Sequence, residues 1–233
     1  MIRAGMIFGT LLSVTVLGAG VFGAGAASAE DTRPLSPAQV ALFESHHLKN
    51  ITHAERLDYS FEHRGGSGDF QDKVTAKIGK TEADGKKEVA LTFLTGSRQL
   101  EFPPVSQFDG NPLIMAFLQH DVALMRDATG GSELYFRNRI REAFIDRAKI
   151  SPVEITIDGK KANATEIVVK PFPGEVHMDR FPDFLEKTYH FVLSDAVPGT
   201  LYRISTTVSK AETGAHKAFE ETLTYAGQHD DTP

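Results

Sequence analysis

The sequence predicts an α+β protein built on a single curved antiparallel sheet of about eight or nine strands, half-barrel-like, with two central helices and one N-terminal helix packed on its apolar face. Short segments that alternate apolar and polar residues recur along most of the chain, which is typical of half-buried strands. Turn sequences join these segments at hairpin distance, with no repeating βαβ rhythm. Two helical segments separate the first group of strands from the second.

The first 29 residues are predicted to be a cleaved signal peptide. Arg3 supplies the basic start, an apolar run extends from Met6 to about Phe22, and small residues lead to a cut after Ala29. The run is interrupted by glycines and is shorter than the roughly 20 residues of a bilayer span. We therefore expect export to the periplasm and no transmembrane segment in the mature chain.

Residues 30–35 read as a polar leader, 36–227 as one α+β domain and 228–233 as a disordered tail. Without its first 29 residues the 233-residue chain keeps 204, enough for a single sizeable core. Removing Arg3 leaves 24 basic against 31 acidic side chains, a formal charge of −7. This charge predicts no nucleic-acid partner. The chain has no cysteine, which excludes disulfides and thiol catalysis.

The first element of the domain is predicted to be a helix. Ser36 fits an N-cap and Pro37 the first helical position, and the helix should run to about His47. Its inward residues are expected to be Val40, Phe43 and Leu48.

Strands follow in "RLDYSFEH", "DKVTAKI" and "KEVALTFL", with turns at "GGSGD" and at Asp84-Gly85. Beyond the helices, "VEITID" and "ATEIVVKP" should pair across Asp158-Gly159. The segments "EKTYHFVLSD", "TLYRISTTVS" and "KAFEETLTYAG" close the sheet, joined by a Pro198-Gly199 turn and a loop around Gly214.

Between the two groups of strands, the first central helix is capped by Asn111 and opened by Pro112. Apolar residues cover most of its circumference, which predicts burial; they are Leu113, Ile114, Phe117, Leu118, Leu124 and Met125. After Gly130 and Gly131, Ser132 caps a second helix whose core stripe is Phe136, Ile140 and Phe144. Antiparallel strands with one apolar face need such a cover.

Motifs for catalysis or metal binding are missing. Ser67 and Ser132 do not fit G-x-S-x-G and are expected to be a turn residue and a helix cap. Glu44-x-x-His47 is half of a di-iron pattern without a second copy. His46, His47, His53 and His63 lack the spacing that converges two imidazoles on one metal. We expect no catalytic residue, no metal and no cofactor.

Two polar groups remain as candidate ligand-binding residues. His120 and Asp121 lie within the apolar helix, but adjacent helical residues point about 100° apart, so a structural role is favoured over an acid/base pair. Arg137 and Arg141 share a face that could bind a carboxylate, a phosphate or a lipid headgroup. A solvated face is the simpler alternative, with Arg137 paired to Glu133 and Arg139 to Glu142.

Phe102 and Phe108, in the loop "EFPPVSQFDGNP", complete the candidate ligand-binding set, although docking on the sheet edge is the favoured account of both.

The runs "FLTGSRQLEFPP…FDGNPLIMAFLQHDVALMRDATGGSELYFRNRIREAF" and "YHFVLSDAVPGTLYRI" resemble a family of exported proteobacterial proteins of unassigned activity, over most of the mature chain. This resemblance implies a compartment but no site residues. The order of elements is also loosely similar to the half-barrel of periplasmic lipoprotein carriers. One departure is that the helices here use up the apolar surface that a carrier would keep for acyl chains.

Two classes of function follow. The first is a non-enzymatic periplasmic protein that binds a lipid-like, amphiphilic or anionic small ligand between sheet and helices, or that contacts an envelope protein. The alternative is a hydrolase or metal-dependent enzyme whose site is assembled from distant strands, with His120, Asp121 and the arginines as the first residues to test.

Overall fold

The computed structural model describes residues 34–66, 68–82, 84–174, 184–209 and 218–230. The predicted signal peptide, Ser67 and the loop around Gly214 lie outside these residues. Within them, no helix is long and apolar enough to cross a membrane.

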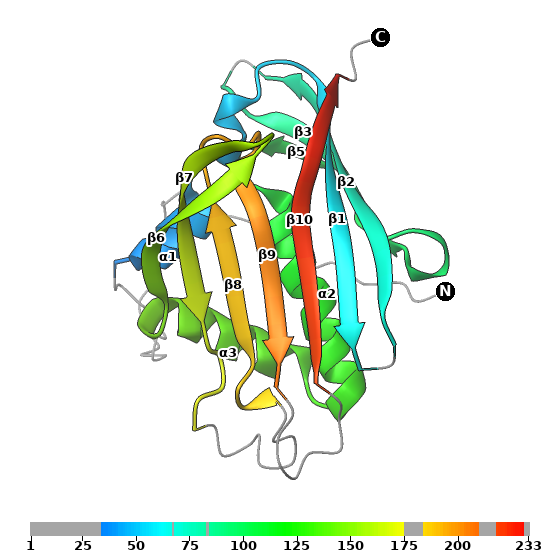
Figure 1. The fold of residues 1–233 in the computed structure, drawn as a ribbon, viewed down its shortest axis with the longest axis vertical. Coiled ribbons are helices and arrows are strands. Elements are labelled where there is room, and N and C mark those ends of the chain that lie inside the picture. Colours follow the sequence, from blue (N-terminus) through cyan, green and yellow to red (C-terminus); the bar gives the residue numbers. More distant parts are fainter. Residues whose placement is uncertain (1–33, 67, 83, 175–183, 210–217, 231–233) are drawn as a thin grey trace, which may run out of the picture. The chain divides into compact units, whose positions relative to one another are not determined.

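The strands form one antiparallel sheet in the order β4-β3-β2-β1-β10-β9-β8-β7-β6, with β5 paired to β3, so the predicted fold class is confirmed (Figure 1). The first half of the chain gives β1 (Glu55–Gly65), β2 (Phe70–Thr81), β3 (Lys87–Phe93), β4 (Leu100–Glu101) and β5 (Val105–Phe108). The second half gives β6 (Lys149–Ile157), β7 (Lys160–Val169), β8 (Thr188–Leu193), β9 (Leu201–Val208) and β10 (Phe219–Asp230). The short β4 and β5 were not predicted. The two halves are joined into one sheet where β1 pairs with β10.

Turn chemistry fixes the predicted hairpins. Asp158 and Gly159 have φ angles of 49° and 76°, the two positive values that a tight two-residue β-turn between twisted strands requires. Gly85, with φ 85°, supplies a positive value within the longer connection between β2 and β3. Both hairpin predictions are confirmed by the pairing of the flanking strands.

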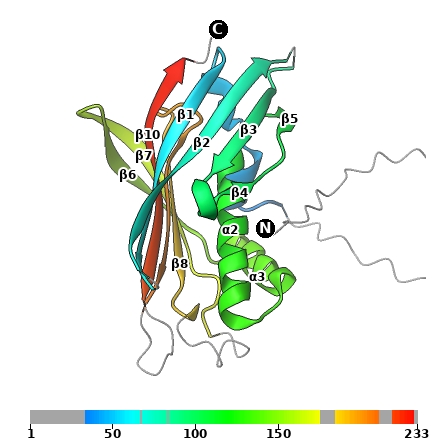
Figure 2. The same ribbon diagram turned by 90° about the vertical axis from the view of Figure 1, so that its right-hand side faces the viewer.

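Helices α2 (Pro112–Thr129) and α3 (Glu133–Asp146) lie on one face of the sheet, which we call the inner face (Figure 2). The Asn111 side chain accepts a hydrogen bond from the Leu113 amide at 3.0 Å, and Gly130 ends α2 in the left-handed conformation, as predicted. Ser132 stands at the N-cap of α3 but its side chain makes no capping hydrogen bond.

The predicted core residues of both helices are buried against the strands. From α2 these are Leu113, Ile114, Phe117, Leu118 and Met125, with Leu124 half-buried. The predicted stripe of α3, Phe136, Ile140 and Phe144, is buried in the same cluster. The inward residues of the strands, among them Tyr59, Phe61, Phe93, Tyr189 and Phe191, complete this core.

The N-terminal segment differs from the predicted single α-helix. It consists of α1 (Pro37–Gln39), a π-helical turn η1 (Val40–Glu44) and a 3₁₀ turn η2 (His47–Asn50). Ser36 caps α1 as predicted, but Val40, predicted to point inward, is 44% exposed. Leu48 is buried and Phe43 is half-buried against Phe144, as predicted. A π-turn advances fewer degrees per residue than an α-turn, and Leu42 is buried in place of Val40.

The C-terminal prediction was wrong by three residues. The tail was expected to be disordered from Gln228, but β10 continues to Asp230, which lies opposite Glu55 at the start of β1. The unpaired N–H and C=O groups at a strand edge favour pairing with another strand. The extension of β10 gives the first residues of β1 such a backbone partner.

Truncating a core residue of α3 tests the helix packing. Phe136→Ala should lower the free energy of unfolding by about 3–5 kcal/mol, because Phe136 is buried against Phe172 with ring centroids 6.1 Å apart. Leu134→Ala, two residues away on the same helix but 63% exposed, should change it by less than about 0.5 kcal/mol. Urea denaturation measures both, and equal effects would contradict the packing described here.

Candidate functional site

A buried charged network lies between the sheet and α2. The Lys187 ammonium donates to Asp121 Oδ1 at 2.8 Å, and both side chains are fully buried. The Tyr189 hydroxyl also donates to Asp121, through Oδ2. Burial raises the pKa of the Tyr189 hydroxyl well above its usual value, and the Asp121 carboxylate adds to the shift. Asp121 therefore accepts hydrogen bonds from Tyr189, near the start of β8, and from Lys187, the residue just before β8.

Glu221 of β10 forms the second part of this network. His63 Nδ1 and His120 Nε2 lie 3.0 and 3.3 Å from the same carboxylate oxygen, Glu221 Oε1. Burial by itself would raise the pKa of Glu221, but the hydrogen bonds with His120 and His63 outweigh it and lower the pKa to about 2. The same contact with Glu221 raises the pKa of His63.

The predicted pair His120–Asp121 is thus split between two sets of partners, as helical geometry requires. His120 contacts Glu221, and Asp121 contacts Lys187. Sequence reasoning missed Lys187, Glu221 and His63. The sequence did contain a signal for two of them. Glu221 and His63 lie two residues from the apolar Leu223 and Phe61, so they point to the same, buried face of the sheet, where polar residues are unusual.

Of the two arginines predicted to share a face, Arg137 is ion-paired and Arg141 has no ion pair with the residues that the structure describes. Arg137 donates to Glu133 at 2.5 Å and to Gln119 at 2.9 Å, and Arg139 lies 3.1 Å from Glu142. Arg141 is exposed on α3.

Phe102 packs edge-on against Phe93, with ring centroids 5.9 Å apart, and Phe108 lies in β5 opposite Lys87. Both residues are half-buried. Neither the aromatic pair nor the four polar residues predicted for ligand binding line either of the two hollows described next.

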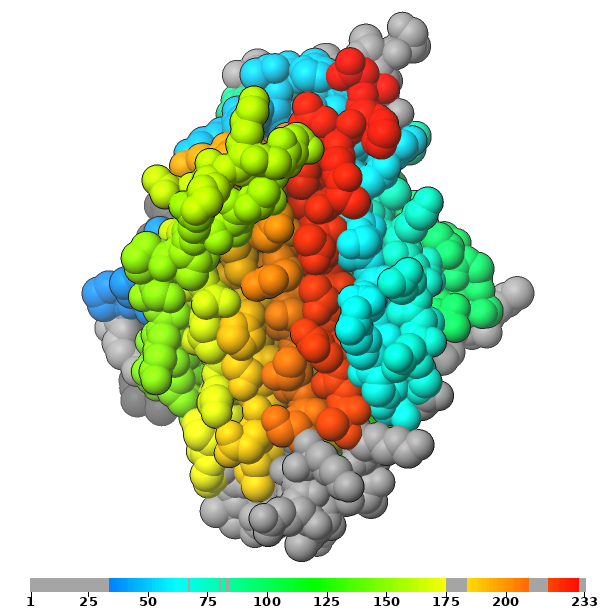
Figure 3. Space-filling model, viewed as in Figure 1, coloured from blue at the N-terminus to red at the C-terminus, as the bar shows by residue number. Residues whose placement is uncertain are grey.

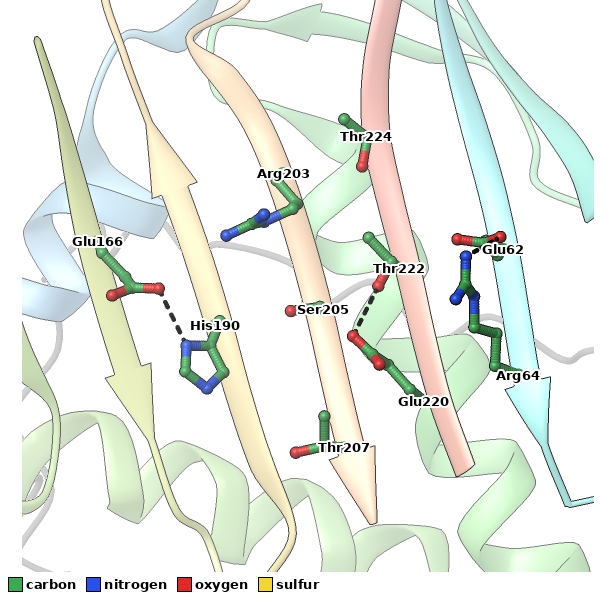
Figure 4. A pocket seen from close by; sticks show the side chains of 10 residues that line it. All are labelled: Glu62, Arg64, Glu166, His190, Arg203, Ser205, Thr207, Glu220, Thr222 and Thr224. Carbon is green, nitrogen blue, oxygen red and sulfur yellow. Dashed lines mark hydrogen bonds and ion pairs between the residues drawn. The ribbon is translucent and has the colours of Figure 1, made fainter. Parts of the chain in front are cut away.

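The first hollow, of about 530 Å³, lies on the outer face of the sheet, the face turned away from α2 and α3 (Figure 3). Strands β1, β7, β8, β9 and β10 contribute the residues that point outward there. The lining residues, which define the outer hollow, are Glu62, Arg64, Glu166, His190, Arg203, Ser205, Thr207, Glu220, Thr222 and Thr224 (Figure 4).

Most charges of the outer hollow already have partners. Arg64 donates to Glu62 at 2.8 Å, and His190 Nδ1 lies 3.0 Å from Glu166 Oε1. The Thr222 hydroxyl donates to Glu220 at 3.3 Å. Each carboxylate of the hollow is thus in contact with a donor from a neighbouring side chain.

Arg203 is the exception. It has no ion pair with any residue in the described part of the chain, and its Nε is buried there without a hydrogen-bond partner. Its guanidinium extends from β9 toward β8, over the floor of the hollow (Figure 4). An unpaired guanidinium among hydroxyl groups is the arrangement that a carboxylate, sulfate or phosphate group would complete.

The second hollow, of about 710 Å³, lies between the N-terminal helical segment and the β6–β9 side of the sheet. His47, which lines it, is satisfied at both ring nitrogens. Nδ1 contacts the hydroxyl of Thr200, and Nε2 lies 3.2 Å from the Leu42 carbonyl oxygen. Lys49 and Asp195, also in the lining, lie 3.7 Å apart. These contacts anchor the N-terminal segment to the turn before β9 and leave no unpaired charge comparable to Arg203.

Among the residues that the structure describes, no group of three or more histidine, aspartate or glutamate side chains is arranged to hold a metal ion.

Removing the charge of one member of the buried ion pair should lower the free energy of unfolding more than removing both charges. Asp121→Asn leaves the Lys187 ammonium buried without a counter-charge and should lower the free energy of unfolding by about 3–5 kcal/mol. The double variant Asp121→Leu/Lys187→Met removes both charges and should recover at least half of that loss. A double variant less stable than Asp121→Asn, in urea denaturation at pH 7, would contradict this interpretation.

The Glu221 network should give a stability that depends on pH. The pKa of Glu221 is lowered from 4.5 to about 2, so its contribution is present above pH 4.5 and lost as the pH falls through that range. The raised pKa of His63 has the opposite sign: its contribution is present below pH 6.5 and lost as the pH rises through the raised value. The difference in unfolding free energy between the wild type and Glu221→Gln should therefore be largest between pH 4.5 and 6.5. A difference independent of pH from 2 to about 8 would count against the network.

No family model matches the chain, and no curated protein is detectably similar to it in sequence. Among solved structures, the lipoprotein LppX of Mycobacterium tuberculosis aligns with a TM-score of 0.33 and 11% identity, covering 84% of this chain and 98% of that one. A DUF1329 family protein from Desulfovibrio piger aligns with a TM-score of 0.29 and 11% identity, covering 78% of this chain and 87% of that one. Likenesses at this level assign neither ligand nor activity.

Proposed function

We propose that this protein is a non-enzymatic periplasmic binding protein whose ligand is a small molecule with an anionic group, held in the outer hollow. The observation that carries the proposal is the unpaired guanidinium of Arg203 in a hollow of about 530 Å³. Guanidinium groups bind carboxylate, sulfate and phosphate through two parallel hydrogen bonds. A volume of this size lies within the range of roughly 300–1,000 Å³ usual for small-molecule sites.

This proposal moves the predicted ligand from the inner face to the outer face. The inner face is occupied by apolar side chains from the strands and from α2 and α3, together with the buried charged network. Neither hollow is lined by any residue of α2 or α3. The outer hollow is lined mainly by polar side chains, which suits a polar anion better than an acyl chain.

Export to the periplasm remains a prediction from the N-terminal sequence, which lies outside the described residues. The enzyme alternative also remains a prediction, although the residues first named for it have other partners: His120 and Asp121 belong to the buried network, and Arg137 is paired with Glu133.

Arg203→Gln tests the proposal. A panel of small carboxylates, sulfates and phosphate esters should contain anions that raise the melting temperature of the wild type. The same anions should lose at least tenfold in affinity, about 1.4 kcal/mol, with Arg203→Gln. Arg141→Gln, which removes an exposed arginine of α3 outside the hollow, is the matched control and should bind as the wild type does.

Unfolding curves and circular dichroism of Arg203→Gln would establish that it keeps the fold. Anion binding that persists in Arg203→Gln but disappears in Arg141→Gln would move the site back to the helix face. An absence of binding by any anion of the panel would overturn the proposal.

A further inference from the structure

The chemistry around Arg203 restricts the kind of anion that the outer hollow can take. This restriction builds on the proposed function and goes further, from an anionic ligand to one chemical class. Three features of the lining decide it: its carboxylates, its hydroxyl groups and the types of side chain that it lacks.

The carboxylates argue against a ligand of high negative charge. Glu62, Glu166 and Glu220 all border the hollow, whereas Arg203 is its only cation without a partner in the described chain. A dianion or polyanion would meet one free guanidinium and three carboxylates of like charge. A single negative charge matches the single free cation.

The same carboxylates, when ionised, only accept hydrogen bonds, so a ligand that lies against them has to bring donors. The hydroxyls of Ser205, Thr207 and Thr224 both donate and accept. A molecule with several hydroxyl groups satisfies both kinds of lining group, whereas a simple carboxylate such as acetate can use Arg203 alone.

None of the ten lining residues is a phenylalanine, tyrosine, tryptophan or aliphatic residue, and the one ring among them, the His190 imidazole, is hydrogen-bonded to Glu166. The lining therefore offers no apolar wall for a fatty acid and only one polar ring beside which an aromatic acid could lie. From these features together we infer that the ligand is a monoanionic, polyhydroxylated acid of the sugar-acid class, with its carboxylate on Arg203 and its hydroxyls among the threonines and glutamates.

Isothermal titration calorimetry with matched probes tests this inference. D-glucuronate and D-galacturonate are the sugar acids, D-glucose and D-galactose their neutral counterparts, and acetate and sulfate the simple anions. The wild type should bind at least one of the two sugar acids at least tenfold more tightly than its neutral counterpart and than either simple anion.

Two substitutions separate the contributions. Arg203→Gln should reduce the affinity for that sugar acid to the level of its neutral counterpart. Thr222→Val, which removes one outward hydroxyl of β10, should lower the affinity for the sugar acid at least threefold and leave the affinity for acetate unchanged. Arg141→Gln should alter neither affinity. Valine suits an extended strand, so the fold of Thr222→Val should be retained.

The failure of the inference can be distinguished from the failure of the proposed function. If acetate or sulfate binds as tightly as both sugar acids, and this binding requires Arg203, the hollow is an anion site but not one for sugar acids. If the neutral sugars bind as tightly as the acids, the carboxylate contributes nothing and both the inference and the proposed anion site are wrong. If no probe binds, the inference is wrong, and the proposed anion site is wrong as well when no anion of the wider panel binds.

Discussion

The packing of α2 and α3 on the inner face of the sheet is the constraint on which the rest of the structure depends. The two helices lie between the two groups of strands in the sequence, and β1 pairs with β10, so strands from both halves share one apolar face (Figure 2). Phe117 and Phe136 are buried beneath that face together with residues from both halves. Burial of apolar surface stabilises a fold by roughly 25 cal/mol for each Å², and the chain has no disulfide to add to it.

The charged network inside this interface gives the packing its orientation. Burying Lys187, Asp121 and Glu221 costs desolvation free energy, which apolar residues of similar size would avoid. The contacts of these groups with α2 form only when the helix presents His120 toward β10 and Asp121 toward the start of β8. We interpret the network as a device that selects one rotation of α2 against the sheet, and polar groups that fix register in other packed helices offer a physical precedent.

Local sequence patterns predicted most of the fold, for identifiable reasons. The alternation in "RLDYSFEH" and the pair Asp158-Gly159 determine a strand and a turn through interactions within a few residues. The helix caps at Asn111 and Gly130 are local in the same way. The π-turn that exposes Val40 and the extension of β10 to Asp230 depend on distant partners, and sequence periodicity does not report such contacts.

The site was harder to predict than the fold, because its residues come from five strands. Arg203, Thr222 and Glu166 are ordinary outward-facing residues of separate strands, and only their pairing places them around one hollow. His120 and Asp121 were recognised as unusual because they interrupt an apolar helix. Their partners, Glu221 and Lys187, lie 101 and 66 residues away along the chain.

Because apolar side chains of the strands, α2 and α3 pack together on the inner face of the sheet, we place the ligand on the outer face. The most direct measurement is an NMR titration of isotope-labelled protein with D-glucuronate and the small anions, following every backbone amide. We expect shifts in the amides of Arg203, Ser205 and Thr222, with those of α2 unchanged. Shifts centred on His120 and Asp121, with the β9 and β10 amides unmoved, would place the ligand between sheet and helices and contradict this placement.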